Sequence, residues 1–141
     1  MRTPDYIAAL AELDVLAECS RTELKHAARF LTRLHIPAGE VVLRQDTAGR
    51  EFLIVADGQL TVTRRDAQSS TLLNVVSTGE IVGEMSLLHR TLRTATVTTL
   101  TPTTVYAGSV PEFFAFMDAV PSAAERIIAT AAERQRSNVA A

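Results

Sequence analysis

The stretch that decides the fold lies in the second half of the chain and runs Gly79-Glu80-Ile81-Val82-Gly83-Glu84-Met85-Ser86-Leu87-Leu88-His89-Arg90-Thr91-Leu92-Arg93-Thr94-Ala95-Thr96-Val97. The apolar pair Ile81-Val82 directly precedes Gly83, and a short segment of helical character follows. Arg93 then begins a run in which threonine alternates with apolar residues. This order predicts a strand that ends at the glycine, one short helical turn, and a return into a second strand.

The same stretch carries the candidate binding residues. Gly83 has no side chain and lets a ligand approach the backbone closely, and the amides of residues 84–86 at the start of the turn predict an anion site. Arg93 can add a charge-assisted contact to a phosphate, supported by Thr94. An acid beside an anion site would repel phosphate, so we expect Glu84 to accept hydrogen bonds from nearby sugar hydroxyls.

Each of these residues also has an ordinary structural explanation. Arg93 by itself would be an exposed arginine in a weak surface ion pair. Glu84 would be an acid of the first helical turn, favoured by the helix dipole, and Thr94 would be a β-forming residue of its strand. The joint spacing of the residues, rather than any one of them, favours a binding site.

Short strands separated by turns surround this stretch. We expect strands over residues 41–44, 51–56, 59–64, 71–76, 94–99 and 103–106. Asp57-Gly58 between two of them predicts a β-hairpin, because both positions of the favoured turn need positive φ. Strands at this close spacing predict a sandwich or a barrel.

Helices are expected at both ends of the chain. Three capping boxes mark helix starts: Ser20-x-x-Glu23, Ser109-x-x-Glu112 and Ser122-x-x-Glu125. The helix after Ser20 should end near Leu34, because a proline and a glycine follow at positions 37 and 39.

Composition and charge exclude several classes of protein. A chain of 141 residues suits one domain with a core that needs neither metal nor disulfide. Its formal net charge of −2 gives no overall drive toward nucleic acid or anionic membranes. Cys19 is the only cysteine, so no intrachain disulfide forms. Because the sequence shows neither a signal peptide nor a run of about 18 apolar residues, we expect a cytoplasmic protein.

Few residues outside the quoted stretch suggest chemistry. His26, His35 and His89 lack metal-ligand spacing, and no Ser, His and Asp signature for nucleophilic catalysis appears. We therefore expect no metal and no enzymatic activity. Arg134 and Arg136, late in the last helix, are expected to be solvated charges.

Residues 82–95 resemble the phosphate-binding cassette of the cyclic-nucleotide-binding domain family. The family pattern is roughly Phe-Gly-Glu, a small residue between apolar ones, a short loop, and Pro-Arg-Ser/Thr/Ala-Ala. The chain has Val82-Gly83-Glu84-Met85-Ser86-Leu87-Leu88 and Leu92-Arg93-Thr94-Ala95, with the family's spacing from glutamate to arginine. Segments 37–45 and 48–58 also look like the entry to the family's β-roll and its central hairpin. The chain departs from the pattern at Val82, at Leu92 and at Asp46-Thr47, where the family has an aromatic residue, a proline and Gly-Asp.

The resemblance implies a single α+β domain with an antiparallel β-roll, a jelly-roll-like double-stranded β-helix. The roll would cover residues 35–108, with the cassette at 82–95. A helical segment over residues 1–34 and C-terminal helices over residues 109–141, which act as lid and dimer helix in the family, would flank the roll.

The resemblance also implies the roles of the site residues. Glu84 would bind the ribose 2′-OH and Arg93 the cyclic phosphate. The other ligand-binding positions would come from the same cassette and from the wall of the roll: Val82, Gly83, Met85, Ser86, Thr94 and Leu73. Of these, the amides near Ser86 and Thr94 would bind the remaining phosphate oxygens, and Val82 and Leu73 would contact the sugar and base.

The implied function is a regulatory sensor module that binds a cyclic nucleotide and has no catalytic activity. We expect cAMP in preference to cGMP as the ligand, and cGMP stays open as the alternative. Its further partners would be a second copy, through the C-terminal helix, and an unknown protein effector. Two alternatives stay open: an interaction or dimerisation module that keeps the fold without the ligand, or the sensor part of a longer transcription regulator. The chain has no room for a DNA-binding motif after the last helix, so we expect no nucleic acid contact by this chain and no membrane partner.

Overall fold

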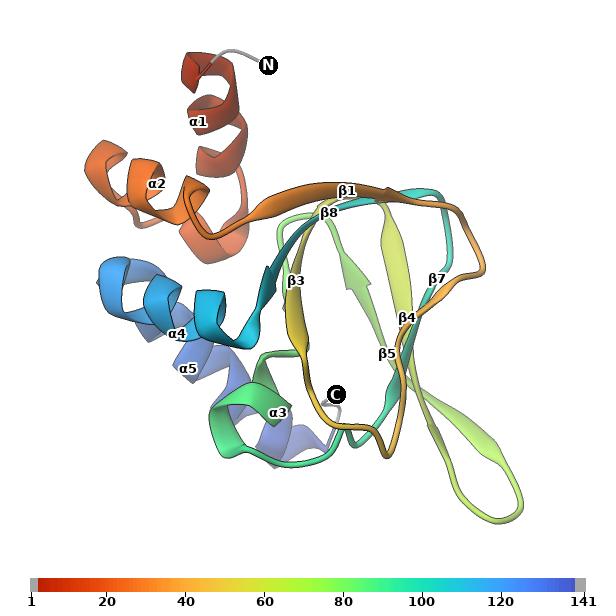
Figure 1. The fold of residues 1–141 in the computed structure, drawn as a ribbon. Coiled ribbons are helices and arrows are strands. Elements are labelled where there is room, and N and C mark those ends of the chain that lie inside the picture. Colours follow the sequence, from red (N-terminus) through yellow and green to blue (C-terminus); the bar gives the residue numbers. More distant parts are fainter. Residues whose placement is uncertain (1–2, 139–141) are drawn as a thin grey trace.

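The computed structural model describes residues 3–138, with side chains from Tyr6 onward, as a roll of strands with helices on one side (Figure 1). The helices are α1 (Thr3–Ala11), the short 3-10 helix η1 (Asp14–Leu16), α2 (Arg21–Ala28), α3 (Glu84–His89), α4 (Val110–Ala119) and α5 (Pro121–Ser137). The strands are β1 (Thr32–Ile36), β2 (Val41–Leu43), β3 (Glu51–Asp57), β4 (Gln59–Arg65), β5 (Ser70–Ser77), β6 (Ile81–Val82), β7 (Thr96–Thr99) and β8 (Thr103–Ser109).

Two antiparallel sheets form the roll. The first has the order β1-β8-β3-β6 and the second has the order β2-β7-β4-β5. The architecture confirms the predicted α+β fold, an antiparallel roll with helices before and after it. Among residues 3–138, no helix combines the length and the apolar character that a membrane span requires.

Apolar side chains pack on both faces of β3, in which residues 52–55 are buried. Between the two sheets, one cluster gathers Leu60, Val62, Val97 and Val105. A second cluster lies between the first sheet and the helices, where Phe52 contacts the rings of Phe113 and Phe116 at centroid distances of 5.0 and 5.7 Å. Figure 1 shows α1, α2, α4 and α5 gathered on the side of β3 that faces away from β4 and β5.

The prediction of a hairpin at Asp57-Gly58 is wrong. β3 and β4 belong to different sheets, so this turn carries the chain across the roll. Gly58 has a φ of 113°, whereas Asp57 is not among the residues with positive φ, which excludes the two-residue turn that the sequence suggested. The hairpin partner of β4 is β5, joined to it by the polar residues 66–69.

The expectation that the second helix ends near Leu34 is also wrong. α2 ends at Ala28, and Thr32–Ile36 forms β1, which overlaps the end of the segment expected to be helical. β1 pairs along its whole length with β8, so a partner more than 60 residues away decides the conformation of a segment whose local pattern is ambiguous.

The first two capping boxes are confirmed, and the third is wrong. At Ser20 and Ser109 both reciprocal hydrogen bonds of the box are present. α5 instead begins at Pro121, two residues earlier than a cap at Ser122 would place it, and Val120 makes no side-chain cap. Ser122 donates hydrogen bonds from its amide and hydroxyl to the carboxylate of Glu23, at 3.0 and 2.9 Å.

Candidate functional site

Gly83 makes room for an arginine at the point where β6 turns into α3. Its φ is 89°, and a Cβ built on it would lie 2.9 Å from Nη1 of Arg93 and 3.2 Å from the carbonyl oxygen of Glu51. Any larger residue at position 83 would therefore displace the guanidinium as well as strain the backbone.

Arg93 is buried, with 2% of its surface exposed, and it points into the turn at the start of α3. Nη1 donates to the carbonyl of Gly83 and to Oγ of Ser86, both at 2.9 Å, and Nη2 donates to the carbonyl of Glu51 at 2.6 Å. The Glu51 carboxylate lies 3.8 Å from Nη2. Burial lowers the pKa of Arg93, and the negative charges of Glu51 and Glu84 oppose this effect. The guanidinium is thus a desolvated cation held against the backbone of the turn between β6 and α3.

The turn at Asp46-Thr47 fixes the backbone of Arg93 from the opposite side. The amide of Arg93 donates to the carbonyl of Thr47, and the amide of Asp46 donates to the carbonyl of Arg93, both at 2.8 Å. Asp46 itself adopts a φ of 66°. This departure from the family's Gly-Asp therefore leaves the arginine anchored at both its backbone and its side chain.

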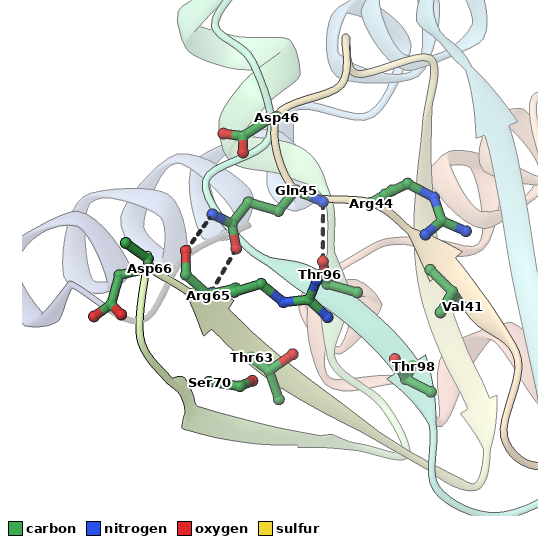
Figure 2. A pocket seen from close by; sticks show the side chains of 11 residues that line it. Val41, Arg44, Gln45, Asp46, Thr63, Arg65, Asp66, Ser70, Thr96 and Thr98 are labelled. Atoms are coloured by element: carbon green, nitrogen blue, oxygen red, sulfur yellow. Dashed lines mark hydrogen bonds between the residues drawn. The ribbon is translucent and has the colours of Figure 1, made fainter.

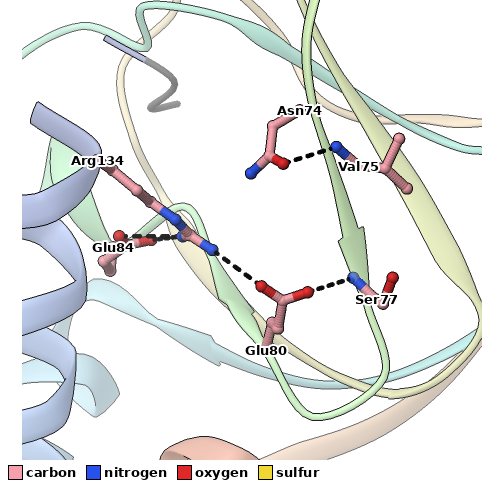
Figure 3. Close-up of polar contacts among 6 residues, drawn as sticks. All are labelled: Asn74, Val75, Ser77, Glu80, Glu84 and Arg134. Atoms are coloured by element: carbon pink, nitrogen blue, oxygen red, sulfur yellow. Dashed lines mark hydrogen bonds and ion pairs between the residues drawn. The ribbon is translucent and has the colours of Figure 1, made fainter. Parts of the chain in front are cut away.

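Glu84 forms a buried ion pair with α5 (Figure 3). It is 1% exposed, and its two carboxylate oxygens accept hydrogen bonds from Nη1 of Arg134 at 2.9 and 3.1 Å. Nη2 of Arg134 lies 4.0 Å from the Glu80 carboxylate. Burial raises the pKa of Glu84, and the charge of Arg134 opposes the increase.

The expectation that Arg134 is a solvated charge is wrong. Arg134 is 8% exposed, whereas Arg136 is exposed and pairs with Glu133 at 2.6 Å. A signal for its burial exists in the sequence, because position 134 continues the inward stripe of Ile127 and Ala131 at helical spacing.

Arg64 is a further polar residue at this end of the roll that the sequence reasoning missed. Its Nε donates to the carbonyl of Thr94 at 2.9 Å, and Nη1 donates to the carbonyl of Asn138, the residue that caps α5, at 3.4 Å. Position 64 follows Leu60 and Val62 on the inward side of β4, and this period of two could have placed it beside the cassette.

The remaining candidate residues have mixed placements. Val82 is buried in the cluster between the sheets, and the half-buried Leu73 packs against the same cluster. Met85 is half-buried, and Thr94 is exposed. The structure thus brings Gly83, Ser86 and Arg93 together. Glu84, on the same short helix α3 as Ser86, points toward α5, and Thr94 lies at the exposed rim of the site.

The groups gathered at this site suit recognition of a ligand. A buried guanidinium, hydroxyl and backbone groups around a glycine suit an anionic ligand, and a buried carboxylate beside them suits hydroxyl donors. Within the described residues, no group of three or more His, Cys, Asp or Glu side chains is placed to hold a metal ion.

Comparison with known proteins agrees with this arrangement. Residues 33–119 match the model of the cyclic nucleotide-binding domain family. The chain belongs to the cyclic nucleotide-binding domain family, a regulatory type of domain, which confirms the resemblance found in residues 82–95.

The relatives differ in what the rest of their chains contain. The chain is 28% identical over 127 residues to the acetyltransferase Pat of Mycolicibacterium smegmatis, and the match covers 90% of this chain and 38% of that protein. It is 28% identical over 92 residues to the cAMP-dependent protein kinase regulatory subunit of Schizosaccharomyces pombe, covering 65% of this chain and 22% of that one. The chain therefore spans well under half the length of these relatives.

A solved structure has the same fold. The catabolite activator protein of Thermus thermophilus superposes with a TM-score of 0.79 at 25% identity, covering 89% of this chain and 59% of that chain. A cAMP-binding acyltransferase from Mycobacterium smegmatis superposes with a TM-score of 0.68 at 25% identity, covering 82% and 38%.

Proposed function

We propose that this chain is a regulatory sensor that binds a cyclic nucleotide, with cAMP preferred over cGMP, and that it has no catalytic activity of its own. The observation that carries the proposal is the buried guanidinium of Arg93 on the Gly83–Ser86 turn, next to the buried carboxylate of Glu84. The relatives named as cAMP-dependent, cAMP-binding or cGMP-dependent support a cyclic nucleotide as the ligand.

In this proposal the protein groups that now satisfy Arg93 give way to the ligand. The cyclic phosphate takes donors of Arg93 that contact the Gly83 carbonyl and the Ser86 hydroxyl, and the amides of residues 84–86 and the rim residue Thr94 contact the other phosphate oxygens. The ribose 2′-OH donates to Glu84. Val82, Leu73 and Met85 contact the sugar and base.

Two arginines would transmit binding to the last helix. Arg134 joins Glu84 to α5, and Arg64 joins the carbonyl of Thr94 to the end of the same helix. A ligand that contacts Glu84 and Thr94 would bind differently to the conformation with α5 docked and to the conformation with α5 undocked. A ligand regulates a protein only if its affinities for the two conformations differ in this way.

A second candidate function follows from the same contacts. Within the described residues, every buried side-chain nitrogen or oxygen already has a hydrogen-bond partner, those of Arg93 and Glu84 included. A closed site of this kind also suits an interaction module that keeps the fold without the ligand. The sensor part of a longer transcription regulator fits the partial coverage of the relatives equally well.

The proposed partners are a second copy of the chain and an effector protein. We propose no nucleic acid or membrane partner, and a location in the cytoplasm. Ile128, which is 54% exposed on the outer side of α5, is the residue we expect at a homodimer contact.

Isothermal titration of the chain with cAMP and with cGMP tests the proposal. We expect saturable binding of both, tighter for cAMP, and loss of binding in Arg93→Lys, because an ammonium group cannot offer a phosphate the planar pair of donors that a guanidinium offers. Arg136→Lys, an exchange of the same type at an exposed position, should bind as the wild type does. If neither nucleotide produces a saturable signal with the folded chain, the interaction module becomes the better explanation.

A further inference from the structure

A polar cavity of about 690 Å³ lies on the outer surface of the second sheet, away from the cassette (Figure 2). Leu60, Val62 and Val97 point into the roll, so the alternate residues of β4 and β7 point outward. Thr63, Thr96 and Thr98 form the floor of the cavity, with Thr63 and Thr96 paired across the two strands.

The end wall of the cavity is held by a side-chain clamp. The amide group of Gln45 donates to the carbonyl of Arg65 at 2.9 Å and accepts from the amide of Arg65 at 2.8 Å. The backbone amide of Gln45 donates to Oγ1 of Thr96 at 3.0 Å. These three bonds tie the end of β2 to β4 and β7, so the walls are set before any ligand arrives.

Two guanidinium groups line this cavity without an ion pair or hydrogen bond to the described part of the chain. They belong to Arg44 and Arg65. In Figure 2 the side chain of Arg65 extends past Thr96 toward the side where Arg44 and Val41 lie. Two arginines beside a row of hydroxyl groups offer the kinds of donor that bind an oxyanion.

The two carboxylates at the rim do not neutralise these arginines. Oδ1 of Asp66 accepts hydrogen bonds from the amides of Gln68 and Ser69, both at 2.9 Å. These bonds lower the pKa of Asp66 and hold its carboxylate within the turn at residues 66–69. Figure 2 shows the carboxylate of Asp46 pointing away from both guanidinium groups.

We propose that this cavity binds a small phosphate-bearing molecule, as a second ligand site outside the roll. The volume is that of a small-molecule pocket, and the lining offers charged and hydroxyl donors with Val41 and Ala67 as its apolar members. The site is separate from the cassette and does not depend on cyclic-nucleotide binding.

The test is a residue-resolved NMR titration of the full chain with inorganic phosphate and, separately, with glycerol 3-phosphate, against sodium chloride at equal ionic strength. Saturable shifts at the amides of Thr63, Thr96 and Thr98 are expected with both phosphates. Tighter binding of the ester would identify an organic phosphate as the ligand class, and equal binding would identify the free ion.

The variants separate the cavity from general charge effects. Arg65→Gln should weaken binding about tenfold, the loss expected for a hydrogen bond to a charged group, and Thr98→Val should weaken it without a change in charge. Arg33→Gln removes the same charge from β1 on the other sheet and should leave binding unchanged. Shifts confined to residues 83–94, shifts equal to those with chloride, or an equal loss in Arg33→Gln would overturn the proposal.

Discussion

Glu84 is a buried carboxylate whose charge depends above all on Arg134. Burial disfavours its ionised form, and Arg134 is the first of the charges that favour it. The pair spans 50 positions in sequence, yet both oxygens are within 3.1 Å of one nitrogen. Removing one member of a buried pair costs more than the pair contributes, because the other charge is left without compensation.

Arg134→Met should therefore lower the free energy of unfolding by about 3–5 kcal/mol at pH 7. The pKa of Glu84 in the folded variant stays above its unfolded value of about 4.3, so the folded state holds the proton more tightly. The contribution of Glu84 to stability is then fully present below that unfolded value and is lost as pH rises through the raised folded value. Urea denaturation at pH 4 and pH 7 should show the smaller loss at pH 4.

Arg136→Met provides the matched control, because Arg136 pairs with Glu133 on the exposed side of the same helix. An exposed pair contributes little, so the change should stay within about 0.5 kcal/mol at both pH values. Equal losses in the two variants would contradict a special role for the buried pair.

At the scale of elements, sequence motifs predicted those helix starts that are determined by hydrogen bonds between nearby residues. The boxes at Ser20 and Ser109 were predictable because each is closed by residues three positions apart. The connection made by Asp57-Gly58 was not predictable, because the packing of the two sheets, rather than the turn, determines which strand pairs with β4. The third box failed because Glu23 of α2 reaches Ser122 from 99 positions away.

Glu23 joins two helices that are distant in sequence, and its removal should affect both. Glu23→Gln should cost about 1–2 kcal/mol of unfolding free energy, since it weakens the cap of α2 and the bonds to Ser122. These amide bonds, Ser122 first and Ser20 second, hold the pKa of Glu23 below its ordinary value. Its contribution is present above the unfolded value and is lost as pH falls through the lower folded value.

Chemical denaturation between pH 3 and pH 7 measures this effect. Glu125→Gln, at the position where the third box was expected, is the control and should change stability by less than about 0.5 kcal/mol. A wild type and a Glu23→Gln variant of equal stability at pH 7 would rule out the contact as a stabilising one.

At the scale of the whole molecule, the sequence predicted the two ends of the cassette but not what surrounds it. Glycine, glutamate and arginine at fixed spacing place Gly83 and Glu84 at the start of α3 and bring the side chain of Arg93 back to that turn. The groups that complete the hydrogen bonds of Arg93 and Glu84 come from β3 and α5, and Arg64 of β4 bonds the neighbouring carbonyl of Thr94. No spacing within the cassette predicts these partners. Long-range pairing of this kind is set by the fold as a whole.

Under the proposed function, cyclic nucleotide should stabilise the cassette and the end of α5 together. At a ligand concentration 100 times Kd, binding adds about 2.7 kcal/mol to the free energy of unfolding. Hydrogen exchange should slow in residues 84–95 and 130–138, because a ribose hydroxyl fixes the carboxylate on which Arg134 depends, and should be unchanged in residues 21–28. Slowing at 84–95 without any change at 130–138 would show that the arginine does not transmit binding.

The contact between Glu23 and Ser122 gives α5 a fixed end. From Ser122 to Asn138 the helix is about 24 Å long, at about 1.5 Å per residue, and its far end meets the roll through Arg134 and Asn138. A helix hinged at one end behaves as a lever, so a rotation of about 10° at Pro121 displaces the other end by about 4 Å. That displacement exceeds the reach of a hydrogen bond, which makes docking of α5 an all-or-none event for a small change in angle.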